Sequence, residues 1–185
     1  MSEESIEAQY QAELKQADVD HHKPTAGAMT GHILANLHVN DVKLHQTSWF
    51  LTGIAAEALQ PLFKELIANG RHNYDALAHV LLDENELPPS TEAEYKEYAM
   101  LEEDGRNKYR DNAALIDMTA HDYNTQNLFI DRAIVLAEQE KRPAMAAFLT
   151  DLRGQNNQAI RRLQAILGKS AWEDLVEEDD DDEDD

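Results

Sequence analysis

The sequence of 185 residues predicts an all-α protein built on a four-helix bundle, with an extra helix before the bundle and a long connection within it. Apolar residues recur at steps of three and four over long segments, which is the pattern of one helix face. Gly and Pro are scarce, with 7 and 5 residues, and both disfavour helix interiors. The sequence contains no competing strand signal.

The first predicted helix covers about residues 4–17 and is rich in Glu and Gln. Its few apolar residues, Ile6, Tyr10 and Leu14, follow one another at four-residue spacing. They form a narrow stripe, so this helix needs a partner surface to be stable. Residues 18–27, which include Pro24 and Gly27, are interpreted as a connector.

Two long helices are expected next, over about residues 28–50 and 55–83, separated by Gly53. Pro61 is compatible with the second of them only near its beginning, because a proline in a helix interior removes a hydrogen bond. The apolar positions that define the two helices are Ile33, Leu34, Leu37, Leu44 and Trp49, then Leu59, Leu62, Phe63, Leu66, Tyr74, Leu77, Leu81 and Leu82.

A loop over residues 84–90 follows, and Ser90 is predicted to cap a short helix that ends near Tyr98. Two more long helices are expected over about 102–140 and 143–167. Pro143 suits a helix start and Gly168 a helix end. The order is two helical hairpins joined by a long crossover that carries a short helix. We therefore divide the chain into an N-terminal helix and connector (1–27), the bundle (28–168) and an acidic C-terminal tail (169–185).

Composition excludes several classes of function. The chain has no cysteine, which rules out disulfides and thiolate chemistry. No segment has the roughly 18 unbroken apolar residues of a membrane span, and the acidic start does not resemble a signal peptide. We therefore expect a cytoplasmic protein. The net charge is −21, but much of the excess lies in the run Glu177–Asp185, which is typical of a solvated tail.

The segment Leu44–Gly53, LHQTSWFLTG, resembles the hallmark of the Dps family, in which a His-Trp-Asn-x-x-Gly motif closes the first bundle helix. Trp49 and Gly53 match this motif, whereas Ser48 stands in the place of its histidine. The segment 74–79 resembles the family's Asp-x-x-Ala-Glu motif, and residues 149–165 resemble its last helix. The likeness spans about residues 28–168 and implies a ferritin-like bundle.

Membership of the Dps family implies a dodecameric shell that binds and protects DNA, oxidises Fe(II) and stores iron under oxidative or starvation stress. It also implies association with the nucleoid. The family's ferroxidase ligands lie at the two-fold interface. One subunit supplies two His and one Asp, and its neighbour supplies an Asp and a Glu four residues apart. Placed from Trp49 and Gly53, the first set falls on Ser48, Gln60 and Lys64, and the second on Asp75 and His79.

Only Asp75 keeps the residue type of the family's ligand set. Serine and glutamine are weak neutral ligands for Fe(II), and the ammonium of Lys64 has no lone pair and repels a cation. The resemblance therefore predicts a degenerate ferroxidase site and leaves open whether the protein is an enzyme. We hypothesise that Lys64 replaces the metal and pairs with Asp75 of a neighbouring subunit. An ordinary interface ion pair is the alternative.

A second candidate metal site consists of His38, Asp41 and His45, which follow one stripe of the second predicted helix. Histidine and carboxylate groups suit Zn(II) or Fe(II), although buried histidines that hydrogen-bond to carboxylates would give the same pattern. Asp75 and His79, at four-residue spacing, form a further candidate pair. No Glu-x-x-His pair occurs in the chain, which argues against a di-iron centre inside one subunit.

DNA binding in the Dps family uses Lys-rich terminal extensions. The N-terminal arm of this chain offers only Lys15 and Lys23 among several acidic residues. We therefore expect weak, steeply salt-dependent binding, aided by twelve copies on one shell. Three interpretations remain. The chain forms an iron-storing and DNA-protecting shell with an altered site, a non-catalytic helical shell or scaffold, or an enzyme whose metal lies at His38, Asp41 and His45.

Overall fold

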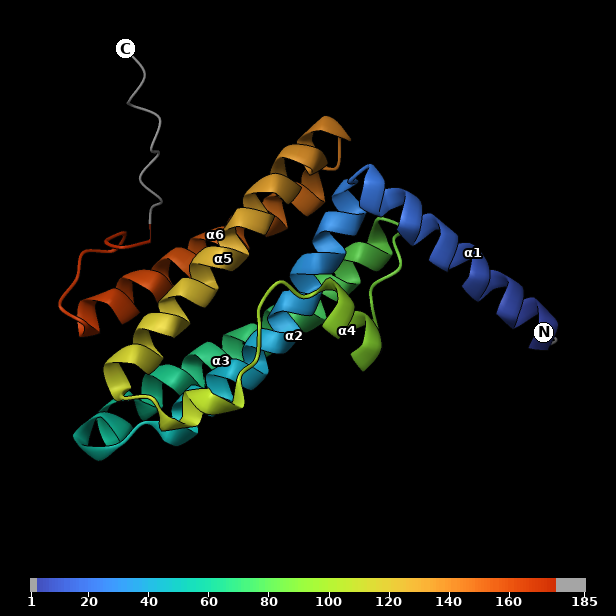
Figure 1. Ribbon diagram of the computed structural model, residues 1–185. Coiled ribbons are helices and arrows are strands. Elements are labelled where there is room, and N and C mark those ends of the chain that lie inside the picture. Colours follow the sequence, from blue (N-terminus) through green and yellow to red (C-terminus); the bar gives the residue numbers. More distant parts are fainter. Residues whose placement is uncertain (1–2, 176–185) are drawn as a thin grey trace, which may run out of the picture.

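The computed structural model describes residues 3–175, except for the side chains of residues 17 and 20–22. This part of the chain is helical and has no strand, so the predicted all-α fold is confirmed (Figure 1). The acidic run 177–185 lies outside the described residues. The elements are α1 (Glu3–His22), α2 (Ala26–Phe50), α3 (Gly53–Asp83), α4 (Glu92–Tyr98), the 3-10 turn η1 (Gly105–Tyr109), α5 (Asn112–Gln139) and α6 (Pro143–Ile166).

The bundle consists of α2, α3, α5 and α6, and its apolar core is divided into two clusters. One cluster joins the first half of α2 with the last part of α3, the last part of α5 and the first half of α6. The other joins the opposite halves of the same four helices. Helix α2 therefore runs antiparallel to both α3 and α5, and α6 runs antiparallel to α5 (Figure 1).

A layer of buried polar side chains separates the two apolar clusters, and all four bundle helices contribute to it. Hydrogen bonds connect several of its members; for example, Nδ2 of Asn156 donates to Oδ1 of Asn127 over 3.1 Å. Buried amides need such partners, because leaving them unpaired is costly. The layer contains Asn40, Lys43, Asn73, Asp122, Gln126, Asn127 and Asn156.

The crossover between α3 and α5 runs along α2. The crossover begins beside the first apolar cluster and ends beside the second. A polar stripe of α2 binds its backbone. His32 Nδ1–H donates to the carbonyl of Tyr98 over 2.7 Å. Asn36 Oδ1 accepts from the N–H groups of Met100 and Leu101 over 2.7 and 3.2 Å. Lys43 and Gln46 donate to the next carbonyls, those of Glu102 and Asp104.

The start of the fourth long helix differs from the prediction. We expected this helix from about residue 102, but α5 begins at Asn112, after η1. Two aspartates explain the interruption. Asp104 accepts from the N–H of Arg106 over 2.8 Å, and Asp111 caps α5 by accepting from the N–H of Ala114 over 2.8 Å. An aspartate satisfies free N–H groups at a helix start and competes with helix in the interior.

The other helix boundaries differ by a few residues. Helix α1 continues to His22, and α3 begins at Gly53 and passes through Pro61. Thr91, and not Ser90, caps α4: its side chain accepts from the N–H of Glu94, whose carboxylate accepts from the N–H of Thr91. This reciprocal capping box is a more complete start signal than one serine.

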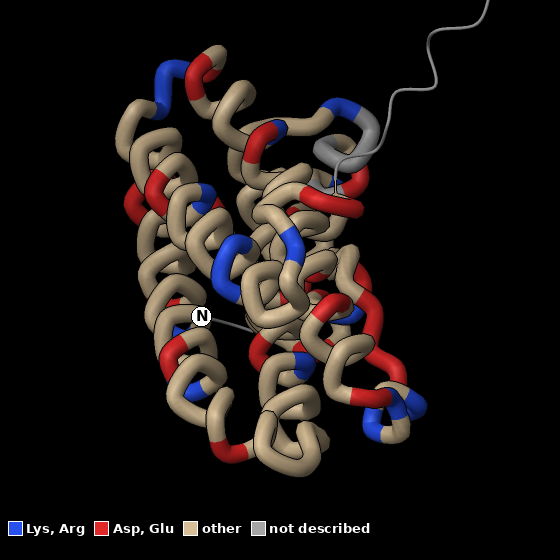
Figure 2. The backbone as a smooth tube through the Cα atoms, turned by 90° about the vertical axis from the view of Figure 1, so that its left-hand side faces the viewer, with Lys and Arg blue, Asp and Glu red and all other residues tan. Residues whose placement is uncertain are grey.

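Helix α1 projects from one end of the bundle (Figure 1), and its apolar residues Ile6, Tyr10 and Leu14 are exposed. Basic and acidic segments are interspersed over the helices and not segregated onto opposite faces (Figure 2). Among the described residues, no helix is long and apolar enough to span a membrane.

Candidate functional site

Ser48, Gln60 and Lys64, the three positions assigned to the family's first ligand set, line one hollow of about 520 Å³. Ser48 lies near the end of α2, and Gln60 and Lys64 lie one helical turn apart in α3. The α2–α3 hairpin brings them together because Gly53 turns the chain there with a φ of +63°. The remaining lining residues are His45, Trp49, Ile67, Ala68 and Arg71.

Arg71 occupies one end of this hollow and is held by Asp41. Its Nε atom donates to Oδ1 of Asp41 over 3.0 Å, and Nη2 donates to Oδ2 over 3.3 Å. His45 Nδ1–H donates to the carbonyl of Asp41 over 2.7 Å, which leaves Nε2 as the acceptor for Arg71 Nη2 over 3.3 Å. Asp41 and His45 therefore lie next to each other, with Nδ1 of His45 3.5 Å from Oδ2 of Asp41, and the guanidinium of Arg71 contacts both.

The chemistry of the hollow opposes a metal cation. Two side chains of its lining, Lys64 and Arg71, are positively charged, and none is a carboxylate. His45 could bind a metal only through the lone pair of Nε2, and this lone pair faces an N–H of Arg71. The sequence suggested weak ligands at Ser48 and Gln60 and a cation-repelling ammonium at Lys64. Arg71, seven residues after Lys64 and therefore on the same helix face, is a further cation that the sequence analysis missed.

Asp75 and His79 are exposed on α3 and do not line this hollow. Each chain therefore presents them away from its own Ser48, Gln60 and Lys64. Their roles as ligands, and the pairing of Asp75 with Lys64 of a neighbour, stay predictions.

His38 lies apart from Asp41 and His45 and contacts the crossover. Its ring stacks on Tyr95 of α4, with 4.2 Å between the ring centroids and 23° between the planes. Its Nε2 atom lies 3.3 Å from the carboxylate of Glu92. Tyr95 is also hydrogen-bonded to Tyr74 of α3, and burial, with this contact, raises the pKa of Tyr95. In the part of the chain that the structure describes, no three His, Asp or Glu side chains form a metal-binding group.

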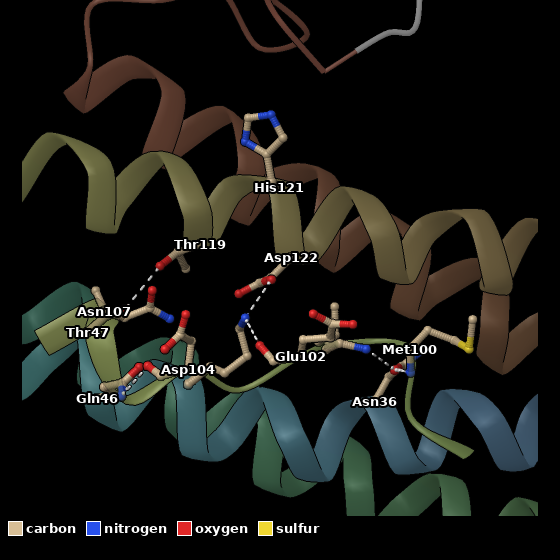
Figure 3. A network of polar contacts seen from close by, with 12 residues as sticks. Asn36, Gln46, Thr47, Met100, Glu102, Asp104, Asn107, Thr119, His121 and Asp122 are labelled. Carbon is tan, nitrogen blue, oxygen red and sulfur yellow. Dashed lines mark hydrogen bonds and ion pairs between the residues drawn. The ribbon is translucent and has the colours of Figure 1, made fainter. Parts of the chain in front are cut away.

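A buried ion pair at the polar layer was also missed from the sequence. Lys43 is 5% exposed, and its Nζ atom lies 3.1 Å from Oδ1 of Asp122 and 2.6 Å from the carbonyl oxygen of Glu102 (Figure 3). Burial raises the pKa of Asp122 to about 6, although Lys43 opposes this shift. Burial therefore outweighs the ion pair. The only sequence signal was a lysine flanked on both sides by apolar residues, Val42 and Leu44.

Lys15 and Lys23, the two cations proposed to contact DNA, are exposed in α1 and in the connector after it. Helix α1 contains six acidic residues and one cation, Lys15, so acidic residues outnumber lysine on this helix.

Comparison with known proteins agrees with this architecture. The chain matches the Ferritin-like domain family over residues 30–171. It is 38% identical to DpsB of Lactococcus lactis, with a TM-score of 0.86 over 91% of this chain and 98% of that protein. DpsA of the same organism is 35% identical, with a TM-score of 0.84 over 91% and 99% of the two chains. The chain belongs to the Dps family.

More distant Dps structures share the fold. Dps from Listeria monocytogenes is 24% identical, with a TM-score of 0.76 over 80% of this chain and 96% of that protein. No curated protein sequence matches the chain. The match to the two lactococcal Dps proteins covers more of this chain than the match to the Listeria protein.

Proposed function

We propose that the protein is the subunit of a Dps-type homododecameric shell that stores iron and protects DNA in the cytoplasm, under oxidative or starvation stress. The observation that carries the proposal is the likeness to DpsB, which covers 98% of that protein at 38% identity. Exposed apolar residues near the hollow support assembly, since Trp49 is 71% and Ile54 89% exposed. Phe50, next to Trp49, is exposed as well, and apolar side chains that gather on one surface are typical of interaction sites.

The proposed shell takes up iron without the family's usual ferroxidase site. This part of the proposal is supported by the lining of the hollow, where Lys64 and Arg71 provide positive charge and no carboxylate is present. Iron would then bind at another group of side chains. Asp75 and His79 are the first candidates, and His38, Asp41 and His45 are the second. A non-catalytic helical shell or scaffold is the alternative, and the same cationic lining favours it.

The assembly is tested by determining the mass of the full chain in solution. A particle of twelve subunits is expected, and a stable monomer at micromolar concentration would overturn the proposal. Aerobic Fe(II) oxidation, followed by absorbance, then distinguishes the two functions. Oxidation and retention of iron above a protein-free control support storage, whereas identical rates support the scaffold. Comparing His79→Ala with His45→Ala identifies which constellation contributes.

DNA binding is proposed to use the N-terminal arm, which carries Lys15 and Lys23. Each arm contributes little charge, so binding should depend on many copies and on low salt. A gel shift at about 20 mM salt should be seen with the full chain and be lost when residues 1–24 are removed. An unchanged shift for the shortened chain would place the contact elsewhere. No shift for the full chain would end the DNA proposal and leave the iron proposal standing.

A further inference from the structure

We propose that the hollow between α2 and α3 binds a free oxyanion, with inorganic phosphate as its simplest ligand. Three different hydrogen-bond donors line it: the hydroxyl of Ser48, the amide of Gln60 and the ammonium of Lys64. Among the described residues, none of these three groups has a hydrogen-bond or ion-pair partner. A tetrahedral oxyanion offers several acceptor oxygens and so satisfies donors that approach from different sides.

Arg71 adds a guanidinium in a fixed position, and Asp41 balances its charge. Asp41 binds its Nε and Nη2 atoms, so the guanidinium plane is held, and Nη1 has no hydrogen-bond partner among the described residues. A pre-organised guanidinium loses little conformational freedom when it binds an oxyanion. Trp49 closes one side of the hollow, and its ring is positioned by an edge contact with His45, with 5.4 Å between the ring centroids.

The net charge of −21 opposes anion binding over long distances, but the local charges favour it. At physiological salt, exposed charges more than about 8 Å apart are largely screened. The lining contains no carboxylate, and Asp41, outside the lining, pairs with Arg71. Glu65, the acidic neighbour of Lys64 in α3, pairs with Arg162 over 2.6 Å, and this contact lowers its pKa. One positive charge, that of Lys64, therefore remains uncompensated.

A carboxylate from a second copy of the chain is the competing occupant, and Asp75 is the candidate. A free oxyanion is favoured because its oxygens point to the corners of a tetrahedron and reach donors on several sides, whereas the two oxygens of a carboxylate lie in one plane. The proposal concerns a ligand of this hollow and does not depend on iron storage or DNA binding.

The experiment is a calorimetric titration of the assembled full chain with inorganic phosphate at constant ionic strength. We expect saturable binding of one phosphate per chain. Lys64→Gln should weaken it by about tenfold or more, since a charge-assisted hydrogen bond is lost. Gln60→Glu should abolish it by placing a negative charge among the donors, and Lys64→Arg should retain it. Lys96→Gln, which removes an exposed lysine of α4 outside the hollow, is the matched control and should change affinity less than twofold.

Three outcomes would overturn the proposal. Absence of saturable binding to the unaltered chain would do so directly. Equal weakening by Lys64→Gln and Lys96→Gln would show general attraction of phosphate to positive charge. Phosphate binding that appears only in Asp75→Asn would show that a carboxylate of a second copy fills the hollow. Sizing of each variant confirms that the compared particles are equally assembled.

Discussion

The Nζ atom of Lys43 lies 3.1 Å from Oδ1 of Asp122 and 2.6 Å from the carbonyl oxygen of Glu102, so one ammonium joins α2, α5 and the crossover. A buried ion pair adds little net stability, because both ions lose their hydration. In this protein the ion pair holds the crossover in place. The same ammonium that neutralises Asp122 also fixes the backbone of the crossover, which places η1 and the start of α5.

Asp122 should make the stability of the protein depend on pH between about 4 and 6. Its pKa is about 6 in the folded protein against an ordinary value of 3.8. Within this range the folded state binds the proton more tightly than the unfolded state, so the contribution of Asp122 to stability falls as pH rises. The full change is about 3 kcal/mol, at about 1.4 kcal/mol for each pH unit between the two pKa values.

The measurement is the free energy of unfolding of the unaltered chain and of Asp122→Asn at several pH values and one subunit concentration. The variant removes the titration of this carboxyl together with its ion pair to Lys43, so the pH dependence of the difference is compared and not its size. The unaltered chain should lose stability relative to the variant from pH 4 to pH 6. A constant difference across that range contradicts the prediction.

Removing one partner of the buried pair should be more harmful than removing both. Lys43→Met leaves Asp122 buried without its countercharge and should lower the free energy of unfolding by about 3–5 kcal/mol. The double variant Lys43→Met with Asp122→Leu should recover most of this loss, because apolar side chains need no hydration. Lys96→Met, at an exposed position, is the control and should change stability by about 0.5 kcal/mol or less. A double variant less stable than Lys43→Met would refute the argument.

Asn36→Leu should loosen the crossover selectively. Asn36 is fully buried, and its Oδ1 atom accepts from two backbone N–H groups, those of Met100 and Leu101. Loss of the acceptor leaves the buried N–H of Leu101 unsatisfied, at a cost of about 1–3 kcal/mol. Hydrogen exchange at residues 100 and 101 should accelerate by at least about tenfold, because a loss of 1.4 kcal/mol corresponds to that factor. Exchange in the centre of α6 should stay the same, and an equal acceleration there would indicate general destabilisation.

Two glycines in helices should respond oppositely to alanine. A Cβ at Gly27 would lie 2.3 Å from Cδ of Glu86, which pairs with Arg142 over 2.7 Å, whereas a Cβ at Gly70 has no neighbour within 4 Å. Gly70→Ala should therefore stabilise the protein by up to about 1 kcal/mol through helix propensity. Gly27→Ala should destabilise it by about 1 kcal/mol or more through overpacking. Denaturant unfolding measures both, and the cost at Gly27 should disappear when Glu86 is replaced by Ala.

The fold was predictable because its signals are periodic and long. The three- and four-residue spacing of apolar residues in 28–50 and 55–83 predicts two helices without knowledge of their neighbours. Trp49 and Gly53 then related the first hairpin to a family. The start of α5 was not predictable from periodicity alone. Residues 102–111 are almost entirely polar and mix helix-forming Glu, Lys and Arg with Gly and Asn, so they carry no apolar period, and the break depends on backbone contacts made by Asp104 and Asp111.

The candidate site was predictable only in part. The spacing of Ser48, Gln60 and Lys64 from Trp49 placed all three in one hollow, because a hairpin of two regular helices converts spacing into position. The involvement of Arg71 depends on its pairing with Asp41 across two helices. The burial of Lys43 depends on Asp122, 79 residues later in the sequence, and on the path of the crossover. Contacts between distant segments leave no periodic signal.

The polar layer between the two apolar clusters also restricts how the helices can pair. Sliding α2 along α5 by one turn, about 5.4 Å, would keep many apolar contacts but would move Lys43 into hydrocarbon and leave Asp122 without a countercharge. Long helices with repetitive apolar faces tolerate such slips, because one leucine replaces another with little penalty. The layer therefore specifies one register among several of similar apolar burial, and with it the alignment of α2 and α3 on which the hollow depends.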